Sequence, residues 1–171
     1  MLPEIKTILY ATNLGPEAPH VFRYALSQAL HYKAKVHVMH ILEPLGSFAR
    51  NLVEQYLSPE QSKEIQDKSK QAVMDRISTR LQAFCDQETC TLNEGTNLVA
   101  DIQVLEGHPS DVIMRQARAI SAELIVMGTH RHVRLSPSGL IGSTARQVIN
   151  ASKIPVLTVY TPEDKLEEIE S

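Results

Sequence analysis

The amino-acid sequence predicts an α/β protein: a five-stranded, mostly parallel, doubly wound sheet of Rossmann-like type, with helices on both faces. Two observations favour this fold class. Short apolar, β-branched runs alternate with amphipathic stretches along the chain, and that order is typical of right-handed crossovers between parallel strands. One run, residues 124–128, is wholly apolar, as expected of a central strand that is covered on both faces.

The first half of the chain contains two expected strands and two expected helices. Residues 5–12 form a β-branched run that ends at the turn-prone residues 13–16. Residues 35–42 form the second strand, closed by a Glu-Pro pair. Between them a helix is expected over residues 18–33, because apolar side chains recur there at helical spacing: Phe22, Ala25, Leu26, Ala29 and Leu30.

The longest connection, from residue 45 to about residue 98, contains the second of these helices. Ser58, Pro59 and Gln61 combine an N-cap, a proline at the first helical position and a capping-box glutamine. The helix that begins there carries one apolar stripe, made of Val73, Ile77, Leu81 and Phe84. The stretch before it, residues 46–57, fits a loop or a short helix.

Three further strands follow, at residues 98–106, 124–128 and 154–160. A helix that opens at Pro109 and a helix through Ala145 and Val148 alternate with them. The last strand, from Ile154 to Tyr160, contains Pro155, which cannot donate to a sheet ladder. We therefore expect either that this strand lies at or near an edge of the sheet or that the proline stands at the start of the strand.

The length of 171 residues suits one domain, expected over residues 1–160, followed by an acidic tail at residues 161–171. The tail carries a charge of −4 and the whole chain −3, so the rest is close to neutral at +1. A near-neutral body lacks the basic surface of a nucleic-acid binder, and nucleic acid is not expected as a partner. No apolar run approaches the roughly 20 residues that span a membrane, and the first residues lack signal-peptide features. A cytoplasmic protein without membrane contact is expected.

Cysteine and histidine residues give only weak indications of chemistry. Cys85 and Cys90 are expected as free thiols near a helix end. His130 and His132 lie one residue apart in a loop, but no third or fourth ligand is apparent, so no metal site is expected. His37 and His40 lie in a strand and are expected to be partly buried and hydrogen-bonded.

Ligands of doubly wound sheets bind beyond the carboxyl ends of the strands, where the winding reverses. Gly128 to Arg131 follow the apolar strand, and Gly142, Ser143 and Thr144 precede the last helix. A glycine lets the backbone approach a phosphate, and a helix N-terminus offers free amides and a positive dipole end. The alternative is that these residues make a tight turn and cap a helix.

Several fragments together resemble the universal stress protein family, over the chain up to about Tyr160. They are residues 8–13 (ILYATN), 36–44 (VHVMHILEP), 106–109 (EGHP), 124–130 (LIVMGTH) and 154–159 (IPVLTV). The family's ATP-binding branch is marked by Gly, two residues, Gly, nine residues and then Gly-Ser/Thr. Gly128 matches the first glycine and Gly142 with Ser143 the last pair, while Arg131 replaces the middle glycine and ten residues follow it instead of nine. Asn13 stands where the family usually has an acidic residue at the nucleoside.

The resemblance implies a dimeric stress-response module that binds ATP or AMP, with Mg²⁺ as a candidate companion. Adenine is then expected near Thr12, Asn13 and Ile41, and the phosphates between Gly128, His130, Arg131 and the group Gly142, Ser143 and Thr144. The homodimer is expected to form through the strand from Ile154 to Tyr160, with Val156 and Val159 near its axis.

Two other functions are alternatives to this one. The first is a dimeric interaction protein with a vestigial pocket, as in the family branch that binds no nucleotide. The second is an enzyme, which is disfavoured because no nucleophile-elbow or adenylylation motif appears. At most slow ATP hydrolysis is expected, since no convincing general base is visible.

Overall fold

The computed structural model describes residues 2–44, 46, 59–90, 92, 97–129 and 142–160. Its strands are β1 (Thr7–Thr12), β2 (Lys35–Leu42), β3 (Val99–Glu106), β4 (Leu124–Thr129) and β5 (Val156–Tyr160). Its helices are α1 (Ala18–Tyr32), α3 (Pro59–Thr89), α4 (Pro109–Ala119) and α5 (Ser143–Ala151). Each of the five expected strands and four expected helices is present, and where an end was predicted it differs by two residues or fewer. Residues 47–57, where a loop or a short helix is expected, lie outside the described residues. The acidic tail lies outside the described residues, so the division into domain and tail stays a prediction.

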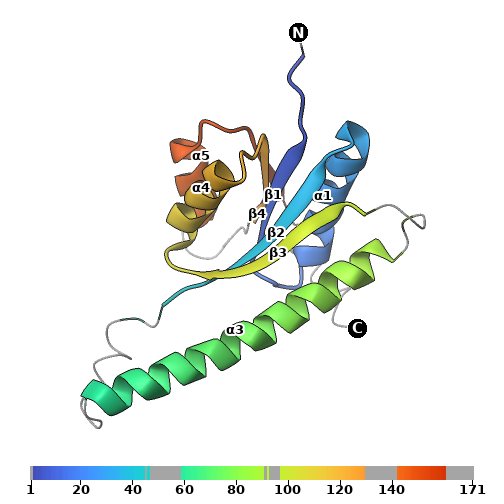
Figure 1. Ribbon diagram of the computed structural model, residues 1–171. Helices are drawn as coiled ribbons and strands as arrows, with labels where there is room; N and C mark the ends of the chain where they lie inside the picture. The colour runs from blue at the N-terminus through green and yellow to red at the C-terminus, as the bar shows by residue number, and fades with distance from the viewer. Residues whose placement is uncertain are drawn as a thin grey trace.

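The five strands form one sheet in the order β3-β2-β1-β4-β5. All the neighbouring strands pair in parallel, which confirms the doubly wound α/β fold (Figure 1). The chain winds from β1 outward to β3 and then returns to add β4 and β5 on the other side of β1. The winding therefore reverses between β1 and β4, and a ligand site is expected at the carboxyl ends of these two strands.

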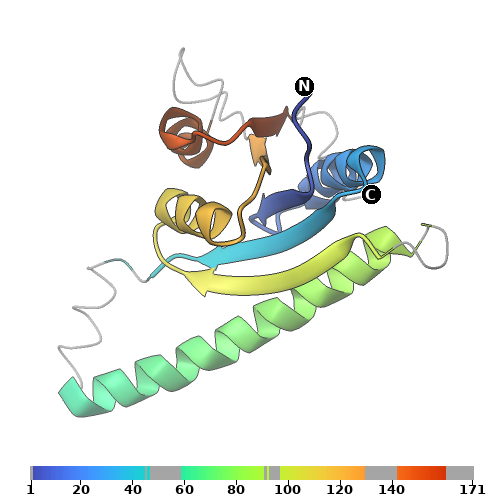
Figure 2. The ribbon, with the colours of Figure 1, turned by 45° about the horizontal axis from the view of Figure 1, so that its top comes forward.

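Helices cover both faces of the sheet, and alternate side chains of β1 show which core lies on which face. Ile8 and Tyr10 pack with residues of α1 and α3, whereas Leu9 packs with residues of α4 and α5. This is the period-two alternation of a strand that is buried on both sides. Figure 2 shows α4 and α5 on one side of the sheet and α1 and α3 on the other.

Helix α3 runs alongside β3 and extends past it, and only its C-terminal part packs on the core. Its 31 residues would span about 46 Å at the usual rise of about 1.5 Å per residue. Leu81 and Cys85 are buried, and the Phe84 ring lies 5.2 Å from the Phe22 ring of α1. Val73, from the same expected stripe, is 42% exposed. Figures 1 and 2 show the N-terminal half of α3 extending past the sheet, where there is no core for this stripe to join.

The burial of Leu30 and the state of the two cysteines were also predicted from the sequence. Leu30, assigned to the apolar face of α1, is 48% exposed, because it lies at the edge of the buried face, whose centre is formed by Phe22, Ala25 and Ala29. Cys85 and Cys90 are free thiols at the end of α3, as expected. None of the described helices is long and apolar enough to cross a membrane.

Strand β5 lies at an edge of the sheet, as its proline indicated. Val159 is only 5% exposed and belongs to the core under α1, while Val156 packs partly against the core under α5. Tyr160, at the end of the strand, is 46% exposed. The faces of β5 are thus occupied by the protein's own core, and a partner strand would meet its open backbone edge.

Candidate functional site

A cavity of about 530 Å³ opens where the winding of the sheet reverses. It is bounded by the carboxyl ends of β1, β2 and β4 and by the starts of α1, α4 and α5. Seven of the residues singled out from the sequence line it together: Thr12, Asn13, Ile41, Gly128, Gly142, Ser143 and Thr144. His130 and Arg131 lie outside the described residues. The sequence did not single out Glu17, although it lines the same cavity.

One part of the cavity is apolar and suits a flat ring. Its lining comes from the ends of three strands and from the start of α4, and comprises Ala11, Ile41, Pro109, Ile113 and Met127. All of these side chains except Pro109 also belong to or border the core under α4 and α5, so most of this wall is continuous with packed protein. Apolar walls with a few fixed polar groups are the usual composition of small-ligand sites.

The turn from β1 to α1 is held by its own side chains. The Thr12 Oγ1 atom accepts a hydrogen bond from the Leu14 amide at 3.0 Å, and Asn13 Oδ1 accepts one from the Gly15 amide at 2.9 Å. Leu14 has a φ of 56°, a left-handed conformation that is uncommon for such a side chain. Short Asn and Thr side chains favour turns of this kind because they bond to the backbone two residues on.

Glu17 is the acidic residue that sequence reasoning overlooked. It occupies the N-cap of α1 and is only 4% exposed, yet its side chain makes no capping hydrogen bond. Instead Glu17 Oε1 accepts a hydrogen bond from Asn13 Nδ2 at 2.8 Å. The carboxylate lies so close above Gly15 that a Cβ atom there would approach its oxygens to 2.7 and 2.8 Å. The signal in the sequence was an acid at a helix start, which the helix dipole favours.

His40, at the end of β2, borders the cavity with a defined tautomer. Its Nδ1 lies 2.9 Å from the carbonyl oxygen of Thr12, and a carbonyl can only accept, so Nδ1 carries the proton of the neutral ring. Burial lowers the pKa of His40, and the positive charge of Arg80 lowers it further, against the opposing effect of the Thr12 carbonyl. The expectation of a partly buried, hydrogen-bonded His40 is confirmed.

The remaining wall of the cavity is made of glycines and backbone amides. Gly128 lies against α1, where an added Cβ atom would be 3.1 Å from Val21 Cγ2. Gly142 is the N-cap of α5 and offers no side-chain acceptor, so the first amides of this nine-residue helix are not capped by that residue. Ser143 and Thr144 add hydroxyls in the same turn. A helix N-terminus of this kind attracts anions such as phosphate.

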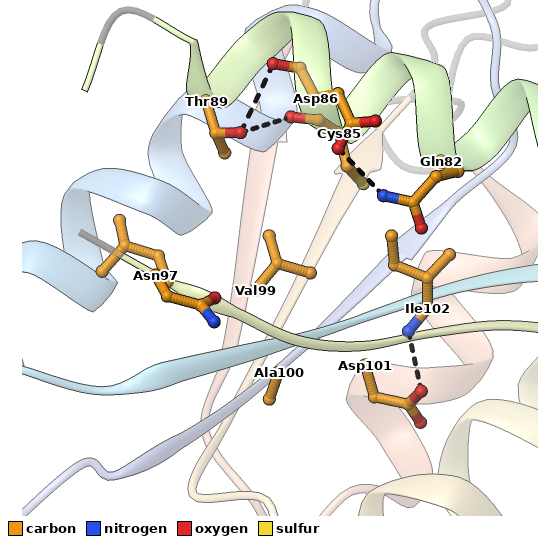
Figure 3. Close-up of a pocket in the computed structure, with 10 residues that line it drawn as sticks. Gln82, Cys85, Asp86, Thr89, Asn97, Val99, Ala100, Asp101 and Ile102 are labelled. Atoms are coloured by element: carbon orange, nitrogen blue, oxygen red, sulfur yellow. Dashed lines mark hydrogen bonds between the residues drawn. The ribbon is translucent and has the colours of Figure 1, made fainter. Parts of the chain in front are cut away.

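A second cavity, of about 450 Å³, lies between the end of α3 and the beginning of β3. Figure 3 shows that several of its polar side chains bond to one another or to nearby backbone, for example Gln82 to Asp86 and Thr89 to the carbonyl of Cys85. It sits at the amino end of β3, opposite to where doubly wound sheets bind ligands. The cavity at the reversal point is therefore the candidate site.

No group of three or more His, Cys, Asp or Glu side chains lies close enough to hold a metal ion in the part of the chain that the structure describes.

Comparison with known proteins identifies the family of the chain. Residues 4–160 match the model of the universal stress protein family. The chain belongs to this family. Among curated relatives, universal stress protein Slr1230 of Synechocystis is 38% identical over 58 residues, which is 34% of this chain and 20% of Slr1230. Stress response protein NhaX of Bacillus subtilis is 41% identical over 59 residues, 34% of this chain and 35% of NhaX. The aligned segments thus span about a fifth and about a third of the lengths of these relatives.

Solved structures share the fold of this universal stress protein at low identity. The hypothetical protein MJ0577 superposes with a TM-score of 0.64 and 21% identity, over 94% of this chain and 99% of that one. A universal stress protein in complex with cAMP gives 0.61 and 18%, over 94% and 100% of the two chains. UspA from Lactobacillus plantarum gives 0.61 and 17%, over 92% and 99%.

Proposed function

We propose that this universal stress protein is a stress-response module that binds an adenine nucleotide, ATP or AMP, in the cavity at the reversal point of the sheet. The observation that supports this most directly is the pairing within one cavity of an apolar wall with the glycine-rich start of α5. An adenine ring needs the first and phosphates need the second. One structural relative was solved with cAMP, which is also an adenine nucleotide.

Each part of the cavity has a role in this proposal. Adenine packs at Ile41 and near Thr12, where the end of β2 offers backbone groups to its edge. The ribose lies near Asn13. The phosphates run from Gly128 to the amides and hydroxyls of Gly142, Ser143 and Thr144, and Arg131 and His130 contribute cationic or hydrogen-bonding side chains from the adjoining loop.

We further propose that the protein works in the cytoplasm as a homodimer joined through β5. An exposed edge strand with apolar, β-branched composition needs cover, and a second copy of the same strand supplies it. A second candidate function, a dimeric adaptor whose pocket is vestigial, is favoured by three departures from the family's ATP-binding signature: Asn13, Arg131 and the additional residue in the loop after Arg131.

The experiment that separates these two functions is direct calorimetric titration of the purified protein with ATP, AMP and adenosine in the presence of Mg²⁺. Micromolar binding of ATP or AMP is expected. Absence of binding at millimolar nucleotide would favour the adaptor.

Two glycine variants test whether the phosphates bind at the start of α5. Gly142→Val should abolish nucleotide binding, because a branched side chain at the start of α5 blocks the approach of phosphate to the amides. Gly46→Val is the matched control: Gly46 is outside the cavity, and an added Cβ atom would meet nothing within 4 Å. A well-folded Gly142→Val protein that binds ATP like the parent would refute the proposed phosphate site.

A further inference from the structure

Strand β3 is one of the two edges of the sheet, and its outward-facing backbone groups can be identified. The Gly107 amide donates to the Leu42 carbonyl of β2 at 3.1 Å, and the register between the two strands is regular over the six residues before Gly107. The backbone groups of successive residues in a strand point alternately to its two sides. Ile102, Val104 and Glu106 therefore turn their amides and carbonyls away from β2, towards the edge.

Two of these three outward amides are open to a partner. The Ile102 amide donates to Asp101 Oδ1 at 2.9 Å, so the neighbouring side chain covers it. Within the part of the chain that the structure describes, the outward amides of Val104 and Glu106 form no hydrogen bond. An edge with open donors and acceptors is a template on which another extended chain can pair.

Helix α3 and the edge of β3 form the two sides of a groove, the α3–β3 groove. Its deepest part is the cavity of about 450 Å³, which residues 97–102 line on one side and the last turns of α3 on the other. Figure 3 shows Ile102 pointing from β3 towards α3 and Asp101 pointing away from it. Beyond the cavity, at the end of β3, Lys70 of α3 pairs with Glu106. The helix therefore accompanies the whole strand (Figure 2). An extended peptide that joins a sheet beside a flanking element is a recurring mode of recognition.

The side chains of β3 predict the pattern of such a peptide. Ile102 and Val104 are half-buried and pack at the margin of the core under α1 and α3. Successive side chains of a strand point to opposite faces of the sheet. A strand added beside β3 would therefore place every second side chain under α3, next to these apolar residues, and the others on the face where Asp101 lies.

The charges of the groove select a basic partner. The cavity is lined by the carboxylates of Asp86 and Asp101 and, among the described residues, by no lysine or arginine. Neither carboxylate forms a salt bridge with a described residue. Lys35 lies outside this lining and donates to the Asn97 carbonyl. A second copy of β3 would bring its own Asp101 and Glu106 to the edge, and like charges on neighbouring strands are destabilising.

We propose that the α3–β3 groove is a docking site for an extended, cationic segment of a partner protein, which adds to the sheet as a further strand beside β3. Apolar side chains of the segment face α3, and lysine or arginine side chains face Asp101. The groove lies outside the nucleotide cavity, so this inference does not depend on the proposed nucleotide function.

The probe is a synthetic peptide of alternating lysine and valine, capped at both ends and fluorescently labelled. Its control has glutamate in place of lysine. Fluorescence anisotropy should show micromolar binding of the lysine peptide and at least about tenfold weaker binding of the glutamate peptide, whose carboxylates meet those of Asp86 and Asp101. Hydrogen exchange measured by NMR should slow at the Val104 and Glu106 amides when the lysine peptide binds. The Thr158 amide, on the outer side of β5, is the control and should not change.

Variants separate the contribution of the backbone from that of charge. Val104→Pro removes an outward donor and leaves the ladder with β2 intact, so it should weaken binding of the lysine peptide at least about fivefold. Val104→Thr keeps the amide and should bind like the parent. Asp101→Asn keeps an acceptor for the Ile102 amide but removes the charge, so it should weaken binding, and more so at low salt. Asp111→Asn makes the same change on an exposed side chain of α4 and should bind like the parent.

Several results would overturn the proposal. They are no binding of the lysine peptide, equal binding of the two peptides, and protection of the Thr158 amide in place of the β3 amides. If Val104→Pro does not fold, Asp101→Asn decides, and parent-like affinity in that variant counts against the groove. If Val104→Pro folds and has a smaller assembly than the parent by light scattering, a second copy covers this edge, and the assignment to a partner protein is wrong.

Discussion

The close approach of Gly128 to α1 allows a quantitative test of why the first glycine of the loop signature is needed. An alanine at position 128 would place its methyl group 3.1 Å from Val21 Cγ2, a few tenths of an ångström inside ordinary van der Waals contact. Gly128 is not among the residues with positive φ, so the backbone accepts alanine and only packing opposes it. The perturbation is therefore Gly128→Ala, alone and combined with Val21→Ala.

The magnitudes follow from these contacts. Overpacking by one methyl group costs about 1–3 kcal/mol, and alanine regains about 0.5–1 kcal/mol over glycine in a strand, so Gly128→Ala should lose about 1 kcal/mol. Val21 is 2% exposed, and its truncation removes the equivalent of two buried methylene groups, about 2 kcal/mol. In the double variant the new methyl occupies space that Val21 vacated. The combined loss should therefore be about 2 kcal/mol rather than 3, a coupling of about 1 kcal/mol.

The assay is urea denaturation of the four proteins of this cycle, with the free energy of unfolding taken from midpoints at a common slope. Losses that add to within about 0.4 kcal/mol would show that residues 128 and 21 do not oppose each other, and would refute the explanation that Gly128 is needed for the approach of α1. A Gly128→Ala protein more stable than the parent would refute it as well.

Two further predictions concern protonation and assembly. Burial lowers the pKa of His40, so the folded protein resists protonating it; stability should be full above about pH 6.5, the ordinary histidine value, and should fall as the pH drops through the lowered pKa. Urea denaturation should show that the free energy of unfolding falls less between pH 7.5 and pH 5.5 in His40→Gln than in the parent. His31→Gln, which changes an exposed histidine of α1, is the control and should behave like the parent. Equal losses in His40→Gln and the parent would contradict the prediction. For assembly, the Ile125 amide bonds to the Pro155 carbonyl, and the alternation of a parallel ladder turns the Thr158 amide outward from β4. Thr158→Pro should therefore remove an outer-edge donor and yield a folded monomer by light scattering, while a parent that is itself monomeric, or a variant that stays dimeric, would count against assembly through β5.

The order of elements was predictable because the local signals in this chain are consistent with one another. Turn residues close each strand, prolines stand at the starts of α3 and α4, and the apolar run at β4 has no polar face. Seven candidate residues could be placed at one edge of the sheet for a topological reason: each lies at or just after the carboxyl end of a parallel strand or at the start of a helix, and such positions converge.

Side-chain burial was less predictable where it depends on the extent of a neighbouring element. The stripe through Val73 and Leu81 has helical spacing throughout, but the sheet ends before the helix does, so Leu81 is buried and Val73 is not. Periodicity describes one helix and carries no information about where its partner ends. Leu30 shows a second limit: its spacing places it at the edge of the buried face of α1, and periodicity does not tell how wide a face the sheet covers, so Ala29 is buried and Leu30 is not.

Glu17 could not be found from sequence for a different physical reason. An acid at a helix start is expected on dipole grounds alone and is usually solvated, so its type and position indicate nothing unusual. What makes Glu17 distinctive is that Asn13 turns an amide towards it and that Gly15 leaves room for the carboxylate beside it. Neither fact is visible until the turn has a conformation, so sequence position alone could not place this carboxylate 2.8 Å from the Asn13 amide.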